Sequence, residues 1–252
     1  MKNIAIIAGG NSSEYEVSMK SGKNIYDEVD ETRYNKYLVV LKERDWHVEI
    51  GEEKYPVDKN DFSFTRNGEK ILFDFAYITI HGVPGENGLL QGYLDMMGVP
   101  YGCCNVLASA LTFDKHTCNT YLKSYGVNVA DSVMLIRGMA YDVNEIINEV
   151  GLPCFVKPNA EGSSFGVTKV KEAAQLEDAL KKAFALCREV LIETFIDGTE
   201  LTCGVVKAGD MDITMPIAEV VPKNEFFDFE AKYDPTKSDE IIPARISPEL
   251  TN

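Results

Sequence analysis

The stretch KPNAEGSSFGV, which begins at Lys157, has the residue types of a loop that holds an anion. Gly162 and Gly166 let the backbone turn and come close to a bound group, and Ser163 and Ser164 add hydroxyl and amide donors. Lys157 precedes a proline, which favours an extended backbone and would let its ammonium group lie over a phosphate. The stretch therefore predicts a phosphate site, although a plain flexible hairpin has the same composition.

Two other polar segments follow buried strands. Residues 3–8 (NIAIIA) form an apolar run closed by glycines, which is typical of a buried parallel strand, and the segment 9–16 after it contains Glu14. Another strand is expected at 73–82 and ends near His81. Ligands of open α/β sheets gather at the carboxyl ends of the strands, so we expect both side chains at a ligand-binding edge. The alternative for His81 is a strand-end residue that only caps a helix.

The elements needed to position these residues follow from the apolar pattern. Over residues 1 to about 110 strands alternate with helices, which favours an open, mostly parallel α/β domain. The strands are expected at 3–8, 34–43 and 73–82, and the helices from near residue 13 to 29 and at 88–98. Gly98 and Pro100 should end the second helix.

From residue 106 onward hairpins outnumber crossovers, which favours an antiparallel sheet with helices on one side. Helices are expected at 106–126, as one unit, and at 172–187. Strands are expected at 152–158, 166–171, 190–196, 201–209 and 211–221.

The composition excludes several classes of partner. The 252 residues include 25 Lys and Arg against 40 Asp and Glu, and the net charge of -15 argues against a nucleic acid or an anionic membrane. The six cysteines form no C-x-x-C pair and no cluster with zinc spacing, so we interpret them as reduced, mostly buried thiols. The alternative is a reactive cysteine, for which the sequence offers no activating neighbour. The N-terminal apolar run is too short for a signal peptide or a membrane span, which favours a cytoplasmic protein.

Six ordered motifs indicate the family, whereas neither a P-loop nor a G-x-G-x-x-G motif occurs. The motifs are AGGNSSEYEVS, HGVPGENGLLQGYLD, NVLASALTFDK, VKPNAEGSSFGV, VLIETFIDGTE and EFFDFEAKY. In this order they resemble the D-alanine:D-alanine ligase family of the ATP-grasp superfamily. The resemblance implies an ATP-grasp fold of mixed α/β and α+β class. It would have a parallel α/β domain at 1–113, a central antiparallel-sheet domain at 114–199 and the start of a C-terminal domain at 200–252.

The same resemblance implies a reaction and a role for each site residue. ATP would phosphorylate one D-alanine, and the amine of a second D-alanine would attack the acyl phosphate. Glu14 would bind the ammonium group of the first D-alanine with Ser163 and Tyr233 hydrogen-bonded to it, and His81 would lie beside the substrate carboxylate or its phosphate. The implied nucleotide contacts are Lys115, Lys157, Ser164 and Lys232 at the phosphates, Glu193 and Ile196 at the adenine, and Glu200 at the ribose.

The resemblance also implies Mg²⁺ or Mn²⁺ and a homodimer. Family members continue past residue 252 and carry the metal ligands and an oxyanion-stabilising arginine there, so no metal ligand is assigned and the chain alone is predicted to have little activity. Two alternatives stay open. One is a nucleotide-binding chain without ligase activity, and the other is an ATP-grasp enzyme acting on another carboxylate, against which Glu14 and the EAKY segment stand.

Overall fold

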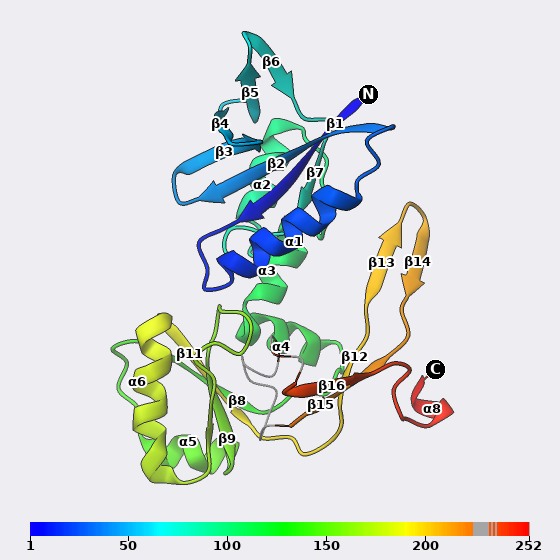
Figure 1. The fold of residues 1–252 in the computed structure, drawn as a ribbon. Coiled ribbons are helices and arrows are strands. Elements are labelled where there is room, and N and C mark those ends of the chain that lie inside the picture. The colour runs from blue at the N-terminus through cyan, green and yellow to red at the C-terminus, as the bar shows by residue number, and fades with distance from the viewer. Residues whose placement is uncertain (224–231, 233, 235, 252) are drawn as a thin grey trace. The chain divides into compact units, whose positions relative to one another are not determined.

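A computed structural model describes residues 1–223, 232, 234 and 236–251. The chain forms two compact units (Figure 1). Unit 1 consists of Met1–Val129 together with Asn159–Gly162, and unit 2 consists of Ala130–Pro158 together with Ser163–Asn252. The division into three domains expected from the sequence stays a prediction.

Unit 1 is built on a seven-stranded sheet with the order β6-β5-β4-β3-β2-β1-β7. The strands are β1 (Lys2–Gly9), β2 (Tyr34–Lys42), β3 (Asp45–Ile50), β4 (Glu53–Asp58), β5 (Ser63–Arg66), β6 (Glu69–Leu72) and β7 (Phe75–Ile78). The expected strands β1, β2 and β7 are parallel, and β1 lies between the other two. The strands from β2 to β6 form an antiparallel meander instead of alternating with helices.

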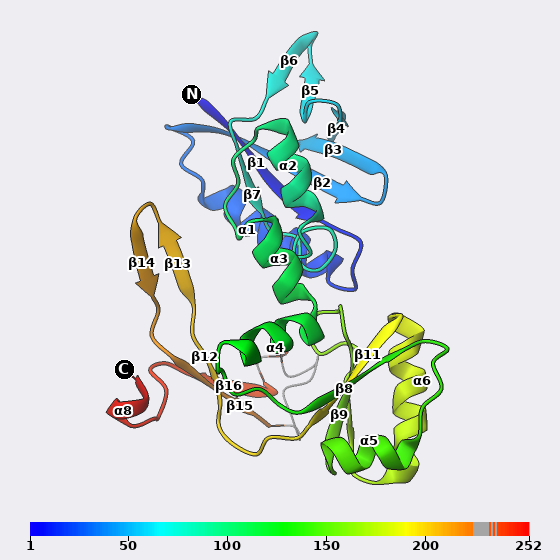
Figure 2. The same cartoon turned by 180° about the vertical axis from the view of Figure 1, so that it is seen from behind.

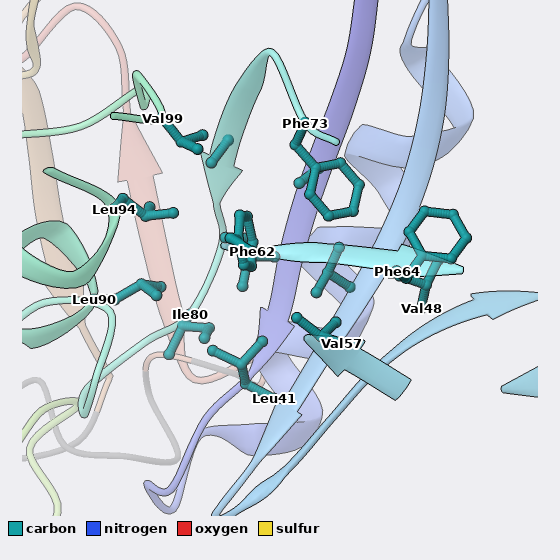
Figure 3. Close-up of a cluster of buried hydrophobic side chains, with 14 residues drawn as sticks. Leu41, Val48, Val57, Phe62, Phe64, Phe73, Ile80, Leu90, Leu94 and Val99 are labelled. Atoms are coloured by element: carbon teal, nitrogen blue, oxygen red, sulfur yellow. The ribbon is translucent and has the colours of Figure 1, made fainter. Parts of the chain in front are cut away.

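Helices cover both faces of this sheet (Figures 1 and 2). α1 (Tyr15–Glu28) lies on one face and α2 (Leu89–Met97) on the other. α3 (Val106–Phe113) packs on α2, and α4 (Lys115–Ser124) packs on α3. In α1, a Cβ added at Gly22 would lie 2.6 Å from the Cβ of Ala8, so this helix packs closely on β1. Figure 3 shows Leu90 and Leu94 of α2 pointing toward the opposite face, where Phe62 and other buried side chains fill the core. Each such fully buried side chain stabilises the fold by about 1.5–3 kcal/mol.

The single helix expected at 106–126 is wrong, because the structure interrupts it at Asp114. This residue has an extended backbone (φ -87°, ψ 106°), and its Oδ1 accepts a hydrogen bond from the backbone N of Thr117 at 2.7 Å. Aspartate is a preferred N-cap residue, so the side chain ends α3 and begins α4. The break places Lys115 in the first turn of α4.

Unit 2 contains a four-stranded antiparallel sheet with the order β10-β9-β11-β8, as expected in type from the sequence. Its strands are β8 (Ser132–Ile136), β9 (Cys154–Pro158), β10 (Thr168–Val170) and β11 (Glu189–Thr194). One face packs on α5 (Val143–Val150) and α6 (Leu176–Leu186), and η1 (Ala173–Gln175) precedes α6. The sequence analysis had no assignment for β8 and α5.

The rest of unit 2 is smaller sheets. One sheet has three strands, β12 (Glu200–Thr202), β15 (Ala218–Pro222) and β16 (Ser238–Ile241). The other is a two-stranded hairpin of β13 (Val205–Ala208) and β14 (Met211–Thr214). The helix α8 (Pro248–Thr251) follows β16 in the sequence. Within the described residues, no helix is long and apolar enough to cross a membrane.

The expectation of mostly buried cysteines is wrong. All six thiols are free, and only Cys154 is buried. Cys103, Cys104 and Cys203 are exposed, because the first two lie in the loop before α3 and the third lies between two short strands.

Candidate active site

Glu14 and His81 lie at the carboxyl edge of the unit 1 sheet, in loops that follow β1 and β7. The Oγ of Ser12 accepts a hydrogen bond from the backbone N of Glu14 at 3.2 Å and donates one to the backbone O of His81 at 2.7 Å. Asn11 N donates to the carbonyl O of Val83 at 2.8 Å. These bonds connect the two loops. The Glu14 residue is only 4% exposed, which restricts the positions its carboxylate can take.

His81 is partly exposed and has an acidic neighbour. Its Nδ1 lies 4.0 Å from Oε1 of Glu86, whose other oxygen accepts a hydrogen bond from the backbone N of Gly82 at 2.7 Å. Glu86 thus fixes the turn that presents the imidazole. The sequence analysis did not single out Ser12 or Glu86, although both lie within the motifs that carry the resemblance.

Asn159 fixes the start of α4 against the loop that contains Glu161. Its side chain is fully buried, its Nδ2 donates to Oδ2 of Asp114 at 2.7 Å, and its Oδ1 accepts from the backbone N of His116 at 2.9 Å. Its carbonyl O accepts from the backbone N of Lys115 at 3.2 Å. The Nζ of Lys115 donates to the carbonyl oxygens of Asn159, at 3.4 Å, and of Glu161. The lysine is therefore held at the loop by both its backbone and its side chain.

The same loop brings Gly162 against Glu14. A Cβ built on Gly162 would lie 2.4 Å from Oε2 of Glu14, so only glycine leaves the carboxylate in its place. Burial raises the pKa of the Glu161 carboxyl group, Lys115 opposes this effect and Glu14 adds to it. Unit 1 therefore brings together two carboxylates, Glu14 and Glu161, the ammonium group of Lys115, and a loop whose Gly162 has no side chain where it meets Glu14.

In unit 2, Lys157 and Glu193 form an ion pair on the sheet face opposite α5 and α6. The rings of Phe155 and Phe195 lie on the same side with centroids 6.0 Å apart, and Nζ of Lys169 lies 3.9 Å from the centroid of Phe195. This face combines flat aromatic surface with ammonium groups and one carboxylate. Such a set can stack a base and hold phosphates. The sequence analysis missed Phe155, Phe195 and Lys169.

The other expected nucleotide contacts in unit 2 vary in their surroundings. Ser163 and Ser164 have φ angles of 49° and 58°, which non-glycine residues rarely adopt and which are found at ligand-binding turns. Ile196 is 67% exposed. Partial burial raises the pKa of the Glu200 carboxyl group, and the positive charge of Lys232 acts in the opposite direction. The two side chains therefore lie close enough to interact electrostatically.

Comparison with known proteins identifies the family. Models described as "D-ala D-ala ligase N-terminus" and "D-ala D-ala ligase C-terminus" match residues 3–104 and 121–252. The chain belongs to the D-alanine–D-alanine ligase family. The D-alanine--D-alanine ligase of Bacteroides fragilis strain YCH46 is 54% identical over 251 residues, which cover 99% of this chain and 77% of that ligase.

Solved structures of ligases have the same fold. The VanG D-Ala:D-Ser ligase from Enterococcus faecalis matches with a TM-score of 0.81 at 31% identity, covering 99% of this chain and 78% of the other. The D-alanine--D-alanine ligase from Bacillus anthracis complexed with ATP matches with a TM-score of 0.73 at 26% identity, covering 99% and 73%. The expected fold class, an ATP-grasp fold, is thereby confirmed.

The metal that the ligase family implies finds no site in the described part of the chain. Among the described residues, no three His, Cys, Asp or Glu side chains are grouped so as to hold a metal ion. Asp234 accepts hydrogen bonds from Thr236, and Asp239 pairs with Lys223 at 3.0 Å. These carboxylates have local partners and do not fit a magnesium site. Tyr233, which was expected to contact Glu14, lies outside the described residues.

Proposed function

We propose that this protein joins two molecules of D-alanine into D-alanyl-D-alanine with ATP, for the synthesis of peptidoglycan precursors. The observation that carries the proposal is the cluster in unit 1, in a chain of the ligase family. There Lys115 is held at the loop after β9, and Gly162 lies against the buried carboxylate of Glu14. A buried carboxylate suits the ammonium group of an amino acid, and the lysine suits a phosphate.

The nucleotide contacts are the next part of the proposal. Phosphoryl transfer depends on positioning and on neutralising charge, and lysines and backbone amides supply both. We assign the contacts as expected from the sequence: Lys115, Lys157, Ser164 and Lys232 to the phosphates, Glu193 and Ile196 to the adenine, and Glu200 to the ribose. The aromatic face next to Glu193 supports the adenine assignment, because a base can stack there.

The amino-acid contacts follow from Glu14. Its carboxylate would bind the ammonium group of the first D-alanine, with Ser163 and Tyr233 hydrogen-bonded to it and His81 beside the substrate carboxylate. The ordered position of Glu14 against Gly162 leaves little space around that ammonium group, which favours a small side chain. We therefore expect D-alanine to be preferred to larger D-amino acids at the first site.

The remaining calls are proposals of the same kind. Mg²⁺, when bound, would offset charge on the triphosphate, but no step is assigned to it because the described residues include no group of three His, Cys, Asp or Glu side chains that could hold it. We propose a homodimer, and we place the protein in the cytoplasm because the reaction consumes ATP. Nothing in the comparisons favours the alternative of nucleotide binding without ligation.

The test is a paired assay of phosphate and dipeptide with ATP, Mg²⁺ and D-alanine. It should be run on this chain and on the chain extended at its carboxyl end to the length of the relatives it matches. Equal amounts of phosphate and D-alanyl-D-alanine from the longer protein, lost in Glu14→Gln and absent with L-alanine, support the proposal. Nucleotide binding in that protein without dipeptide would favour the alternative.

A further inference from the structure

Two of the six thiols lie in the cavity that contains Lys115. This cavity of about 380 Å³ lies wholly in unit 1, and its lining includes Cys103, Cys104, Gln91, Lys115 and Glu161. From this arrangement we infer that Cys104 is a modification site through which a small, neutral, amide-bearing electrophile blocks the Lys115 cavity. The blocking effect rests on the proposed function, whereas the modification itself does not.

The loop that carries the thiols is held in place by several hydrogen bonds. The carbonyl O of Cys104 accepts bonds from Ser109 Oγ at 3.2 Å and from Cys103 Sγ at 3.4 Å. The side chain of Asn105 accepts a hydrogen bond from the backbone N of Ala108 at 2.9 Å and caps α3. Cys104 is nevertheless exposed. The loop therefore presents two accessible thiols, those of Cys103 and Cys104, to the cavity in defined places.

A second observation indicates that the cavity can take a hydrogen-bond donor. Gln91 is 1% exposed, and its Nε2 donates to the carbonyl O of Gly85 at 2.5 Å and to Cys103 Sγ at 3.4 Å. Its Oε1 is buried and has no hydrogen-bond partner among the described residues. An acceptor in this state costs free energy, and a ligand that brings an N–H group would remove that cost. A primary amide attached beside it carries such a group.

The two thiols should differ in reactivity. Both residues are exposed, but the Sγ of Cys103 accepts a hydrogen bond from Nε2 of Gln91 at 3.4 Å and donates one to the carbonyl O of Cys104 at 3.4 Å. Partial burial of the thiol also raises the pKa of Cys103, which the hydrogen bond from Gln91 opposes. Because the sulfur of Cys103 must leave these bonds before it attacks as a thiolate, we expect Cys104 to react first. With iodoacetamide, the Cys104 sulfur forms a bond to the CH₂ carbon, the carbon–iodine bond breaks, iodide leaves and the thiol proton goes to solvent.

Charge at the cavity gives a second criterion. The lining carries two carboxylates, Glu86 and Glu161, against one ammonium group, that of Lys115, so its net charge is negative and iodoacetate should react more slowly there than iodoacetamide. Cys203 is exposed in unit 2 and serves as the internal reference for both reagents.

The experiment treats the folded chain with limiting iodoacetamide or iodoacetate and follows each cysteine by peptide mass spectrometry. We expect Cys104 to be labelled before Cys103, and the ratio of amide to acid rates to be several-fold larger at Cys104 than at Cys203. Failure to label Cys104 while Cys203 reacts, or labelling of Cys103 first, overturns the inference. None of these readouts needs ligase activity, so they are independent of the proposed function.

The activity readout uses matched serine variants of this chain extended at its carboxyl end to the length of the relatives it matches. Cys104→Ser should retain dipeptide synthesis and become resistant to iodoacetamide, whereas Cys203→Ser should stay as sensitive as the parent. If iodoacetamide inhibits Cys104→Ser as strongly as the parent, the inference that modification of Cys104 blocks the cavity is wrong. An untreated protein that makes no dipeptide contradicts the proposed function instead, and the labelling results still decide the modification site.

Discussion

Gly162→Ala is the most direct test of the way in which the loop positions Glu14. The added Cβ would lie 2.4 Å from Oε2 and 3.4 Å from Cδ of Glu14, and the first distance is well inside van der Waals contact. Glu14 is 4% exposed, so its carboxylate cannot simply turn into solvent. The backbone of Gly162 is not among those with positive φ, so alanine adds no strain of its own and the substitution tests the contact alone.

The size of the effect follows from the overlap. Extra methyl groups in packed sites typically cost about 1–3 kcal/mol, because neighbours must leave their preferred positions. For a chain of this length, that loss lowers the midpoint of thermal unfolding by roughly 2–12 °C. The relief requires Glu14 or the loop to move by about 1 Å, and such a displacement of a substrate-positioning group can lower the rate about 100-fold.

The assays are thermal unfolding and the kcat/KM for D-alanine, with ATP affinity measured separately. We expect kcat/KM for D-alanine to fall far more than ATP affinity, because Gly162 contacts Glu14, the residue proposed to bind the ammonium group of D-alanine. Gly92→Ala is the matched control: its Cβ would lie 3.8 Å from Val106, an ordinary contact, within α2. Alanine there should stabilise the helix by up to about 1 kcal/mol. If Gly162→Ala behaves like this control, the positioning of Glu14 by Gly162 is wrong.

Three further predictions follow from ionised side chains. Lys157→Met should lower the free energy of unfolding by about 1–3 kcal/mol, because the buried carboxylate of Glu193 loses this cation, and it should also weaken ATP binding. Adding Glu193→Gln should restore the stability but not the ATP affinity. Thermal unfolding measures the first effect, and calorimetric titration with ATP measures the second. The bidentate bond from Arg245 lowers the pKa of Glu219 to about 2, so its stabilisation is present above the unfolded value of 4.5 and is lost as pH falls toward 2. Arg245→Met should therefore unfold more easily at pH 7, with the difference from the parent closing by pH 2. Burial raises the pKa of Glu161, so ionising this carboxyl group costs more free energy in the folded chain than in the unfolded chain. Glu161→Gln should therefore be as stable as the parent near pH 4 and more stable than the parent at pH 8, as thermal unfolding at the two pH values can show.

The sequence predicted the elements whose patterns are long and regular. β1 is a continuous apolar run, and α2 carries an apolar face that ends at Gly98, so their positions are confirmed. The helix expected after β1 is also present, as α1. The hairpins between β2 and β7 were missed because their strands are short and mostly polar. A local signal did exist: Asn67 and Gly68 have φ angles of 52° and 81°, as an Asn-Gly hairpin turn requires.

The interruption at Asp114 had a different cause. The apolar pattern on both sides of it is helical, and only the capping preference of aspartate distinguishes two helices from one. A cap of this kind is worth about 1 kcal/mol, which is too small to recognise in a pattern of many residues. The break matters for the site, because it turns the first residue of α4, Lys115, toward the loop after β9.

The candidate site shows the same division between chemistry and positioning. Residues that would touch substrates have reactive side chains within motifs, so sequence reasoning could propose Glu14, Lys115 and Lys157. The residues that position them act through backbone hydrogen bonds across long separations, such as Asn159 to His116 and Ser12 to His81. Neither bond leaves a local pattern in the sequence.

One loop connects the two halves of the proposed reaction. Lys157, assigned to the nucleotide, lies near the end of β9 in unit 2. Residues 159–162, which fix Lys115 and border Glu14, pack within unit 1. Unit 2 continues at Ser163, and both Ser163 and Ser164 have φ angles in the left-handed region. In the proposed assignment, the chain thus passes from a phosphate contact to an amino-acid contact and back within a few residues. A change that loosens Asn159 should therefore disturb Lys115 and Glu14 together, so the affinities for ATP and for D-alanine should fall in parallel in an Asn159→Ala variant, and unequal losses would show that the two contacts are independent.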